Sequence, residues 1–297
     1  MAYRNPLLLI TRKQIKNQQS LNVVISSALP QVEPGSNLYI QITADYTQLS
    51  ILIDELVSVY DTARHYSEEN KNISTYVLFG SNYLNLFNYC DWTIALYQSS
   101  DALSRFINKP GIPIKLLQES NTDLSEFKPD AHPMDNLTGS KDEYHTVAVG
   151  GTFDHLHDGH KILLTASIFL ASTILIIGVT GPKLLVNKKY AEYMESYDQR
   201  ASIVGRFVKL IDFNQRTDFY QINDVCGPTG HINEIDALVV SFETASGGDY
   251  VNNLRKEEGL KQLKIIAVCV IGGKDSEQFK EKLSSTYLRK LEAEKQQ

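Results

Sequence analysis

The sequence predicts an α/β protein in which a doubly wound parallel sheet fills the C-terminal half and a separate α/β domain precedes it. Two observations predict this class. Short apolar runs rich in β-branched residues alternate with longer runs of helical periodicity along most of the chain. A polar stretch that contains Pro129 and Pro133 interrupts the alternation near its middle, as a linker between two domains would.

The composition limits the classes of function. The chain has 297 residues, of which 42% are hydrophobic and 22% are charged, as in soluble globular proteins large enough for two domains. The net charge of −6 argues against nonspecific binding to nucleic acid. The three cysteines are odd in number and widely spaced, which favours reduced thiols in the cytoplasm over a disulfide framework.

Residues 1–117 are predicted to form the N-terminal α/β domain, whose role the sequence does not reveal. Its strand-like runs are 37–43, 74–80 and 92–98, and a helix-like run covers 48–64. We find no catalytic arrangement of side chains in this domain. Polar residues 118–143 are the predicted linker.

Residues 144–297 are predicted to form the catalytic domain, because strands and helices alternate more regularly there. Its helices are expected to begin near Asp158, at Ser196 with a capping box completed by Gln199, around residue 252 and near Ser284. The strand-like runs of this domain are 145–150, 173–180, 218–224, 236–242 and 263–271. Ligands of such sheets bind where the carboxyl ends of strands feed helices.

One segment of this domain requires a test for membrane insertion. The 21 residues between Lys161 and Lys183 carry no charge, which is near the length that spans a bilayer. However, Ser172 and Thr173 divide the segment into a helix-like first half and a short β-branched second half. We therefore expect a buried helix followed by a buried strand, and no membrane span.

The run "VAVGGTFDHLHDGHK" places three of the chain's seven histidines, His155, His157 and His160, within six residues. A zinc site is one interpretation, since imidazole is a common zinc ligand. The three side chains span a turn into a helix, however, and the sequence has no cysteine nearby and no HExxH pattern. We therefore expect no metal ligands among the residues of this run.

A phosphate site is the favoured interpretation of the same run. Gly150 and Gly151 end a strand and let the backbone approach a ligand closely. The helix expected from Asp158 offers unpaired N–H groups at its N-terminus. His157 and His160, separated by two residues, are able to face the same anion from the first turn. This arrangement would stabilise the charge that develops on a phosphate during an in-line displacement.

The run "HDGH", 157–160, resembles the HxGH motif of the nucleotidyltransferase superfamily, and "KLSSTYLRK", 282–290, resembles its C-terminal (I/L)SSTxxR motif. Two such motifs at opposite ends of one α/β domain are more specific than either alone. Residues 178–200, 222–230 and 236–248 narrow the resemblance to eukaryotic-type phosphopantetheine adenylyltransferases. The resemblance covers roughly half of the chain, and it does not depend on the alternation of strands and helices, which many families share.

The resemblance implies a Rossmann-like nucleotidyltransferase fold and one reaction. AMP passes from ATP to 4′-phosphopantetheine, and dephospho-CoA and pyrophosphate are formed, as a step of coenzyme A biosynthesis. The resemblance also implies Mg²⁺ bound together with ATP and no covalent enzyme intermediate. The implied partners are ATP, 4′-phosphopantetheine and dephospho-CoA. Two roles stay open for the N-terminal domain: docking of other coenzyme A pathway enzymes, or setting of the oligomeric state.

The resemblance assigns a role to individual residues of both motifs and of the loops between them. The implied catalytic residues are His157, His160 and Lys183. The implied ATP-binding residues are Gly150, Gly151, Thr152, Phe153, Glu243, Ser284, Ser285, Thr286 and Arg289, of which Arg289 would contact the β- and γ-phosphates. The residues implied to bind phosphopantetheine are Thr152, Lys183 and Arg200. Phe242 and Gly181 depart from the family pattern, which usually has acidic residues there.

Three alternatives stay open at this point. Cytidylyltransferases and nicotinamide-mononucleotide adenylyltransferases share both motifs, although the first usually have an RTxG run where this chain has "EKLSS". A non-catalytic scaffold with a relic nucleotide site would explain the N-terminal domain. A second activity is the third alternative, because animals fuse the family domain to a dephospho-CoA kinase. The run "IGGKDSEQ", 271–278, lacks the loop length of GxxxxGK(S/T), so we expect no kinase activity.

Overall fold

The computed structural model of the chain describes residues 2–67, 72–87, 89–106, 111–118, 127, 137–186, 188–270 and 284–295. The chain divides into two compact units: Met1–Tyr46 with Asp54–Ala131, and Thr47–Ile53 with His132–Gln297. Most of the predicted linker, 118–143, and the run 271–278 lie outside the described residues. The domain boundaries at 117 and 144 therefore remain a proposal.

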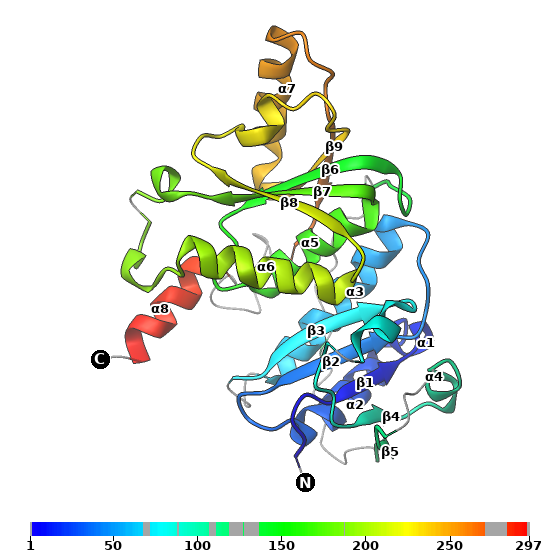
Figure 1. The fold of residues 1–297 in the computed structure, drawn as a ribbon. Helices are drawn as coiled ribbons and strands as arrows, with labels where there is room; N and C mark the ends of the chain where they lie inside the picture. Colours follow the sequence, from blue (N-terminus) through cyan, green and yellow to red (C-terminus); the bar gives the residue numbers. More distant parts are fainter. Residues whose placement is uncertain are drawn as a thin grey trace. The chain divides into compact units, whose positions relative to one another are not determined.

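The first unit contains a parallel sheet of five strands in the order β3-β2-β1-β4-β5 (Figure 1). The strands are β1 (Leu7–Ile10), β2 (Asn37–Ile42), β3 (Ser74–Phe79), β4 (Ala95–Tyr97) and β5 (Ile114–Leu116). The helices are α1 (Arg12–Ile15), α2 (Gln18–Ala28), α4 (Ser100–Ser104) and the part of α3 (Leu49–Ser67) that follows Ile53. The predicted strands β2, β3 and β4 and the helix α3 are confirmed, whereas β1, β5 and α2 were not predicted.

The second unit contains another parallel five-stranded sheet, in the order β10-β9-β6-β7-β8. Its strands are β6 (Tyr144–Gly151), β7 (Ala171–Thr180), β8 (Arg216–Ile222), β9 (Ala237–Ser241) and β10 (Lys264–Val268). Its α-helices are α5 (Asp158–Leu170), α6 (Tyr197–Ile211), α7 (Ala245–Glu257) and α8 (Ser285–Lys295). Helices α5 and α6 cover one face and α7 the other, which confirms the doubly wound fold (Figure 1).

Short 3₁₀ turns occupy several of the loops at the carboxyl ends of these strands. They are η3 (Pro182–Leu184), η4 (Ala191–Tyr193), η5 (Gly227–Gly230) and η6 (Phe242–Thr244). The capping box predicted at the start of α6 is present: Ser196 Oγ accepts from Gln199 N–H, and Gln199 Oε1 accepts from Ser196 N–H. This cap fixes where the chain leaves the loop after β7 and begins α6.

The uncharged segment 162–182 is divided between a helix and a strand, as the sequence predicts. Helix α5 ends at Leu170, and β7 begins at Ala171 without an intervening loop. Both elements are largely buried, which accounts for the absence of charge. In the part of the chain that the structure describes, no helix has both the length and the apolar character needed to cross a membrane.

The central strand β6 positions the candidate site. Val149 of β6 is paired with Ile177 of β7 on one side and with Val239 of β9 on the other. Because the three strands are parallel, their carboxyl ends lie at one edge of the sheet. The loop that carries the histidines leaves β6 at this edge and enters α5.

Candidate active site

The loop from β6 to α5 has an unusual backbone. Phe153 and His155 adopt positive φ angles of 49° and 47°, a region that residues with a Cβ seldom occupy. Such conformations persist only where the surroundings impose them. Here the N–H of His155 donates to Glu195 Oε2 at 2.8 Å, and the buried Phe153 ring packs beneath Gly151. The strained loop therefore has a fixed shape before any ligand binds.

The two histidines of the predicted phosphate site are brought together. His157 is the N-cap residue of α5 and His160 lies in its first turn. Their rings stack with centroids 3.8 Å apart and an interplanar angle of 22°. Among the described residues, neither Nδ1 atom has a hydrogen-bond partner, although both atoms are buried. Buried polar atoms without partners are uncommon, and they favour a ligand here.

Burial keeps both imidazoles neutral. Burial, against the attraction of Asp158 and with help from the nearby Lys161, lowers the pKa of His157 to about 4. Burial also lowers the pKa of His160 well below its ordinary value, and the neighbouring His157 and Lys161 add to the effect. At neutral pH the pair therefore offers neutral N–H donors, and an arriving anion would favour their protonation.

Gly159 lies between the two histidines. A Cβ at this position would come within 3.2 Å of Cε1 and Nδ1 of the His157 ring. That distance is shorter than an ordinary van der Waals contact, so a larger residue would displace the imidazole. The glycine therefore allows the stacked arrangement of the two rings.

The predicted hydroxyl-rich turn begins a helix, as the sequence predicts. Ser284 Oγ accepts from Tyr287 N–H at 3.3 Å, and its carbonyl accepts from Leu288 N–H at 3.0 Å, which caps α8. Ser285 Oγ donates to the carbonyl of Asp154 at 2.8 Å. The two motifs therefore meet: the turn that opens α8 lies directly against the histidine loop.

A buried ion pair joins the same two segments. Arg289 Nη1 donates to Asp154 Oδ2, and both side chains are almost completely inaccessible to solvent. The remaining donors of Arg289 go to the Lys189 carbonyl at 3.1 Å and to Thr286 Oγ1 at 3.1 Å. The guanidinium predicted to contact phosphates is thus engaged within the protein, and its contact with ATP stays a prediction.

His155 connects this pair to a second side chain of α8. Its Nδ1 lies 3.2 Å from Asp154 Oδ1 and its Nε2 lies 2.9 Å from Glu292 Oε2. The hydrogen bond to Asp154 raises the pKa of His155 to about 9, against the effect of burial and with help from Glu292. His155 is therefore a cation at neutral pH, unlike His157 and His160.

Asp154, His155 and Glu195 have ligand atoms within 4.8 Å of one another, the spacing of a small metal site. The Asp154 carboxylate, however, already accepts from Arg289 and from the N–H of Glu195 at 3.0 Å. Glu195 accepts from the backbone of His155. A buried guanidinium and a charged imidazole beside these oxygens disfavour a metal ion, so we describe the cluster as an ion-pair network.

The Arg200 side chain is hydrogen-bonded to the carboxyl ends of two neighbouring strands. Its guanidinium is 1% exposed and donates to the carbonyls of Glu195 at 3.0 Å, Thr152 at 2.6 Å and Thr180 at 2.9 Å. Thr152 follows β6, and Thr180 ends β7. These contacts fix the edge of the sheet, and the predicted contact of Arg200 with phosphopantetheine stays a prediction.

The other predicted residues line the same edge. Lys183 is exposed in η3, directly after β7, and Glu243 lies in η6, directly after β9. Gly150 and Gly151 end β6, and Phe153 is fully buried against the His160 ring, with centroids 5.3 Å apart. The structure thus brings the predicted residues to the carboxyl ends of three adjacent strands.

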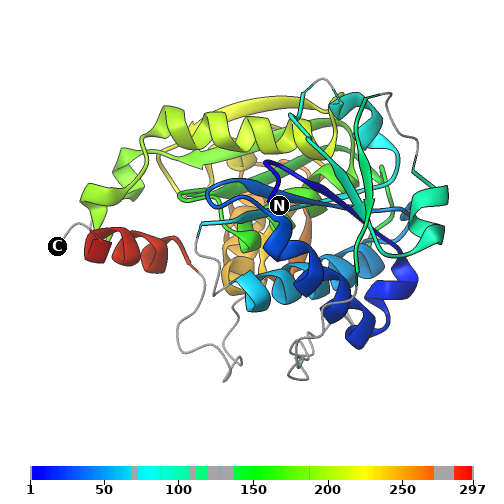
Figure 2. The same ribbon diagram turned by 90° about the horizontal axis from the view of Figure 1, so that it is seen from below.

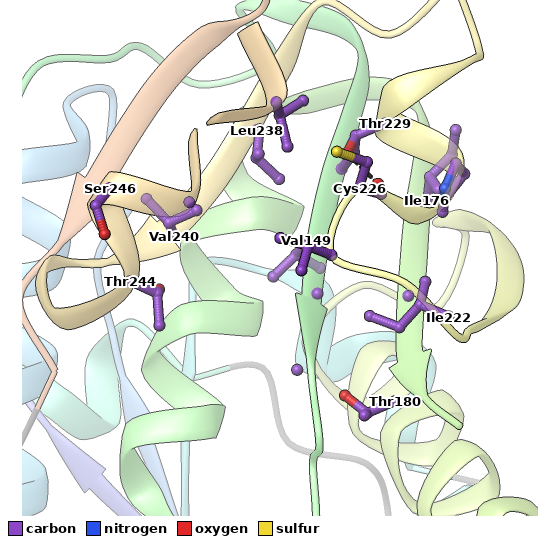
Figure 3. Close-up of a pocket in the computed structure, with 18 of the residues that line it drawn as sticks. Val149, Ile176, Thr180, Ile222, Cys226, Thr229, Leu238, Val240, Thr244 and Ser246 are labelled. Carbon is purple, nitrogen blue, oxygen red and sulfur yellow. Dashed lines mark hydrogen bonds between the residues drawn. The ribbon is translucent and has the colours of Figure 1, made fainter. Parts of the chain in front are cut away.

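A pocket of about 440 Å³ opens beside these residues on the face of the sheet that α7 covers. Figure 3 shows side chains from β6, β7, β9 and η5 around it, among them Ile176, Leu238 and Val240. Its wall is mainly apolar, and Glu243, Thr244 and Thr180 provide polar groups near the strand ends. Gly150 and Gly151 border it, so the pocket and the histidine loop share the end of β6.

Sequence reasoning did not identify two parts of this site. Asp154 and Glu292 were not singled out, although a carboxylate inside the histidine run and a charge one turn beyond Arg289 are visible in the sequence. The pocket was not predicted either. Its lining residues come from segments that are far apart in the chain, so only the folded arrangement shows that they form one cavity.

Comparison with known sequences agrees with the family resemblance of the two motifs. The sequence model of the cytidylyltransferase-like family matches residues 148–291. The chain is 48% identical over 160 residues to phosphopantetheine adenylyltransferase of Saccharomyces cerevisiae, a match that covers 53% of this chain and 52% of the yeast protein. The match therefore spans about half the length of that relative.

Two further relatives extend the comparison. The phosphopantetheine adenylyltransferase of Pyrococcus abyssi is 38% identical over 147 residues, which cover 50% of this chain and 90% of the archaeal protein. An uncharacterized protein of Schizosaccharomyces pombe is 34% identical over 228 residues, which cover 73% of this chain and 71% of that protein. The archaeal relative corresponds in length to the second unit, and the fission-yeast match is longer than that unit.

Proposed function

The chain belongs to the phosphopantetheine adenylyltransferase family, and on that premise we propose that it transfers AMP from ATP to 4′-phosphopantetheine, forming dephospho-CoA and pyrophosphate. One observation carries the proposal. Ser285 donates to the carbonyl of Asp154, three residues before the stacked His157–His160 pair, so both motifs lie at one point of the sheet edge.

The geometry supports an in-line displacement on the α-phosphorus. A phosphate oxygen of 4′-phosphopantetheine forms a bond to Pα, and the bond from Pα to the oxygen bridging to Pβ breaks, so pyrophosphate leaves. His157 and His160 would donate to the phosphate oxygens, where charge accumulates. The N-termini of α5 and α8 would add backbone N–H groups and the positive ends of helix dipoles. Catalysis would consist of alignment and charge stabilisation, without a protein nucleophile.

The apolar pocket supports the choice of acceptor. Pantetheine is a long, mostly uncharged arm attached to a phosphate, so its site needs an elongated apolar cavity close to a cation. The pocket bordered by Gly150, Leu238 and Val240 is mainly apolar, and the exposed Lys183 lies just after the neighbouring β7. We assign the arm to the pocket and the acceptor phosphate to Lys183.

ATP would bind as its Mg²⁺ complex, and the metal ion would screen the negative charge of the triphosphate. We further propose that the chain lacks dephospho-CoA kinase activity, since its sequence contains no GxxxxGK(S/T) loop. The three cysteines, none of which forms a disulfide, support a reducing compartment such as the cytoplasm.

The test is pyrophosphate release by the pure chain, with MgATP and one of three acceptors: 4′-phosphopantetheine, phosphocholine or nicotinamide mononucleotide. Turnover with 4′-phosphopantetheine alone is expected. Turnover only with one of the other two acceptors, or with CTP in place of ATP, would assign a different nucleotidyltransferase reaction. Tight ATP binding with no turnover on any acceptor would favour a scaffold with a relic site.

A further inference from the structure

Helix α8 makes several polar contacts with the rest of its unit. Arg289 and Ala293 are its buried residues, and only Ala293 of the two is apolar. Tyr287, Leu288 and Leu291 are only half-buried, so the contacts of the charged groups contribute to whether the helix stays docked. In Figures 1 and 2, α8 lies beside the segment that precedes α6, where Arg289 meets the Lys189 carbonyl.

From these contacts we propose that Asp154 is a positioning residue that, together with His155, docks α8 on the histidine loop and so completes the triphosphate site. The inference rests on the proposed function for its kinetic consequences. Its structural part, the docking of α8, does not depend on which acceptor the protein uses.

Asp154 contacts α8 through two different groups. Its carbonyl accepts from Ser285 Oγ, and its carboxylate accepts from Arg289, one helical turn further along. Two attachments a turn apart fix both the position and the rotation of a helix. Since Ser285 belongs to the turn predicted to bind phosphate, the position of Asp154 sets the position of that turn.

The Asp154 side chain is itself fixed. It is fully buried, and its second carboxylate oxygen accepts from the N–H of Glu195 and lies beside Nδ1 of His155. Because the carboxylate is held in one position, it also fixes the position of the Arg289 guanidinium that pairs with it. Without that charge, Arg289 would be a buried cation lacking a counterion, which is strongly unfavourable.

His155 makes a further contact between the histidine loop and α8, through Glu292. The titratable groups that face it are Asp154 and the neutral His157 on its own loop, Glu195 before α6, and Glu292 on α8. Glu292 is three residues after Arg289, so both lie on the same side of the helix. The cationic imidazole therefore links the loop to α8 below pH 9, and this link weakens when the proton is lost.

The experiment uses the full chain and three variants. Asp154→Asn removes the charge that faces Arg289. Glu292→Gln removes only the charge that faces His155, at a side chain that is 46% exposed. Glu294→Gln is the matched control: it removes the same charge from the same helix, at a carboxylate 3.9 Å from Lys290 and 57% exposed. If Asp154→Asn does not fold, Glu292→Gln still tests the proposal.

The first measurement is hydrogen exchange followed by mass spectrometry, which requires no turnover. Amides of 285–295 are expected to exchange at least about tenfold faster in Asp154→Asn, while amides of α5 and α6 keep their protection. Glu292→Gln is expected to show a smaller, selective acceleration, and Glu294→Gln none. Equal protection of α8 in all four proteins would overturn the proposal, as would a uniform loss of protection across the unit in Glu292→Gln.

The second measurement is the KM for each substrate as a function of pH. Asp154→Asn is expected to raise the KM for ATP roughly tenfold or more and to change the KM for 4′-phosphopantetheine less than about twofold. In the wild type, the KM for ATP is expected to rise as pH passes 9. Glu292→Gln should move that rise to lower pH, since one carboxylate that raises the pKa of His155 is gone.

The two proposals fail in different ways. Equal changes in both KM values would show that Asp154 acts only on folding and would overturn its positioning role. A wild type that releases no pyrophosphate, with α8 selectively loosened in the variants, would refute the proposed reaction and support the docking role.

Discussion

Arg289 and Asp154, 135 residues apart in the sequence, form a buried ion pair that joins the end of the chain to the loop that carries the histidines. The pair accounts for the proximity of two motifs that the sequence separates. It also means that the Arg289 guanidinium has partners within the protein, and through its contact with Thr286 it helps to place the turn that opens α8.

Removal of either stacked imidazole is expected to slow the chemical step. His160→Ala and His157→Ala should each lower kcat by about 10²–10³-fold, because each removes a donor to the charge that develops on phosphate. The KM for 4′-phosphopantetheine should change much less. Rates of pyrophosphate release at saturating MgATP provide the measurement. His145→Ala, at an exposed histidine of β6, is the control; a kcat unchanged in His160→Ala would contradict the assigned role.

Binding of the triphosphate is expected to take up protons. Burial lowers the pKa of His157 to about 4 and that of His160 well below its ordinary value, so both are neutral in the free protein at pH 6 to 7. Anionic oxygens beside the rings raise their pKa values. Titration calorimetry with pyrophosphate in two buffers of different ionisation enthalpy should show a net uptake that grows as pH falls from about 7 towards 5. Proton release, or uptake that is the same in His157→Gln, would count against this prediction.

The same depressed pKa values predict loss of stability in acid. In the unfolded chain a histidine binds its proton near pH 6.5, whereas His157 in the folded chain stays neutral until about pH 4. The unfolded state therefore binds more protons in this interval, and the free energy of unfolding falls as pH decreases from about 6.5 to 4. Thermal melts across this range should show a shallower decrease for the His157→Gln, His160→Gln double variant. A slope identical to that of the wild type would be evidence against buried neutral imidazoles.

Replacement of Arg200 is expected to lower the free energy of unfolding more than it weakens the binding of phosphopantetheine. Lysine has one ammonium group on a flexible stem and cannot satisfy the carbonyls of Glu195, Thr152 and Thr180 together. Arg200→Lys should lower the free energy of unfolding by about 2–4 kcal/mol, since buried acceptors lose their donors. Denaturant unfolding provides the measurement, with Arg206→Lys at an exposed position of the same helix as the control. Unchanged stability combined with a weaker affinity for phosphopantetheine would instead indicate direct contact with the substrate.

Filling the apolar pocket is expected to weaken binding of the acceptor alone. Val240→Phe places a larger side chain in the wall of the pocket and should raise the KM for 4′-phosphopantetheine roughly tenfold, with little change in the KM for ATP. Val186→Phe, at a position that is 68% exposed and does not line the pocket, is the matched control. An increase in the KM for ATP alone would place the nucleotide, and not the pantetheine arm, in this cavity.

Local sequence patterns predicted much of the second unit. The capping box of Ser196 and Gln199 and the glycines that end β6 depend on residues close in sequence, and both are present as expected. The division of the uncharged segment 162–182 was also predictable, because helical periodicity gives way there to β-branched residues. The structure places the helix end at Leu170, two residues before Ser172.

What the sequence did not reveal depends on contacts between distant segments. β1 is four leucine and isoleucine residues, too short a run to distinguish a strand from the start of a helix. Asp154 looks like an ordinary loop carboxylate until folding brings Arg289 to it. The pocket likewise needs Ile176, Cys226 and Leu238, from three separate elements, to be close in space.

The order of strands in the first unit determines where the protein tolerates shortening. The first strand in the chain, β1, is the central strand of the sheet. It lies between β2 and β4, and all four of its residues are fully buried. Removal of the first ten residues would divide the sheet into two pairs of strands with newly exposed, apolar edges, which promote aggregation. Shortened versions for crystallisation should therefore leave the amino-terminal segment intact.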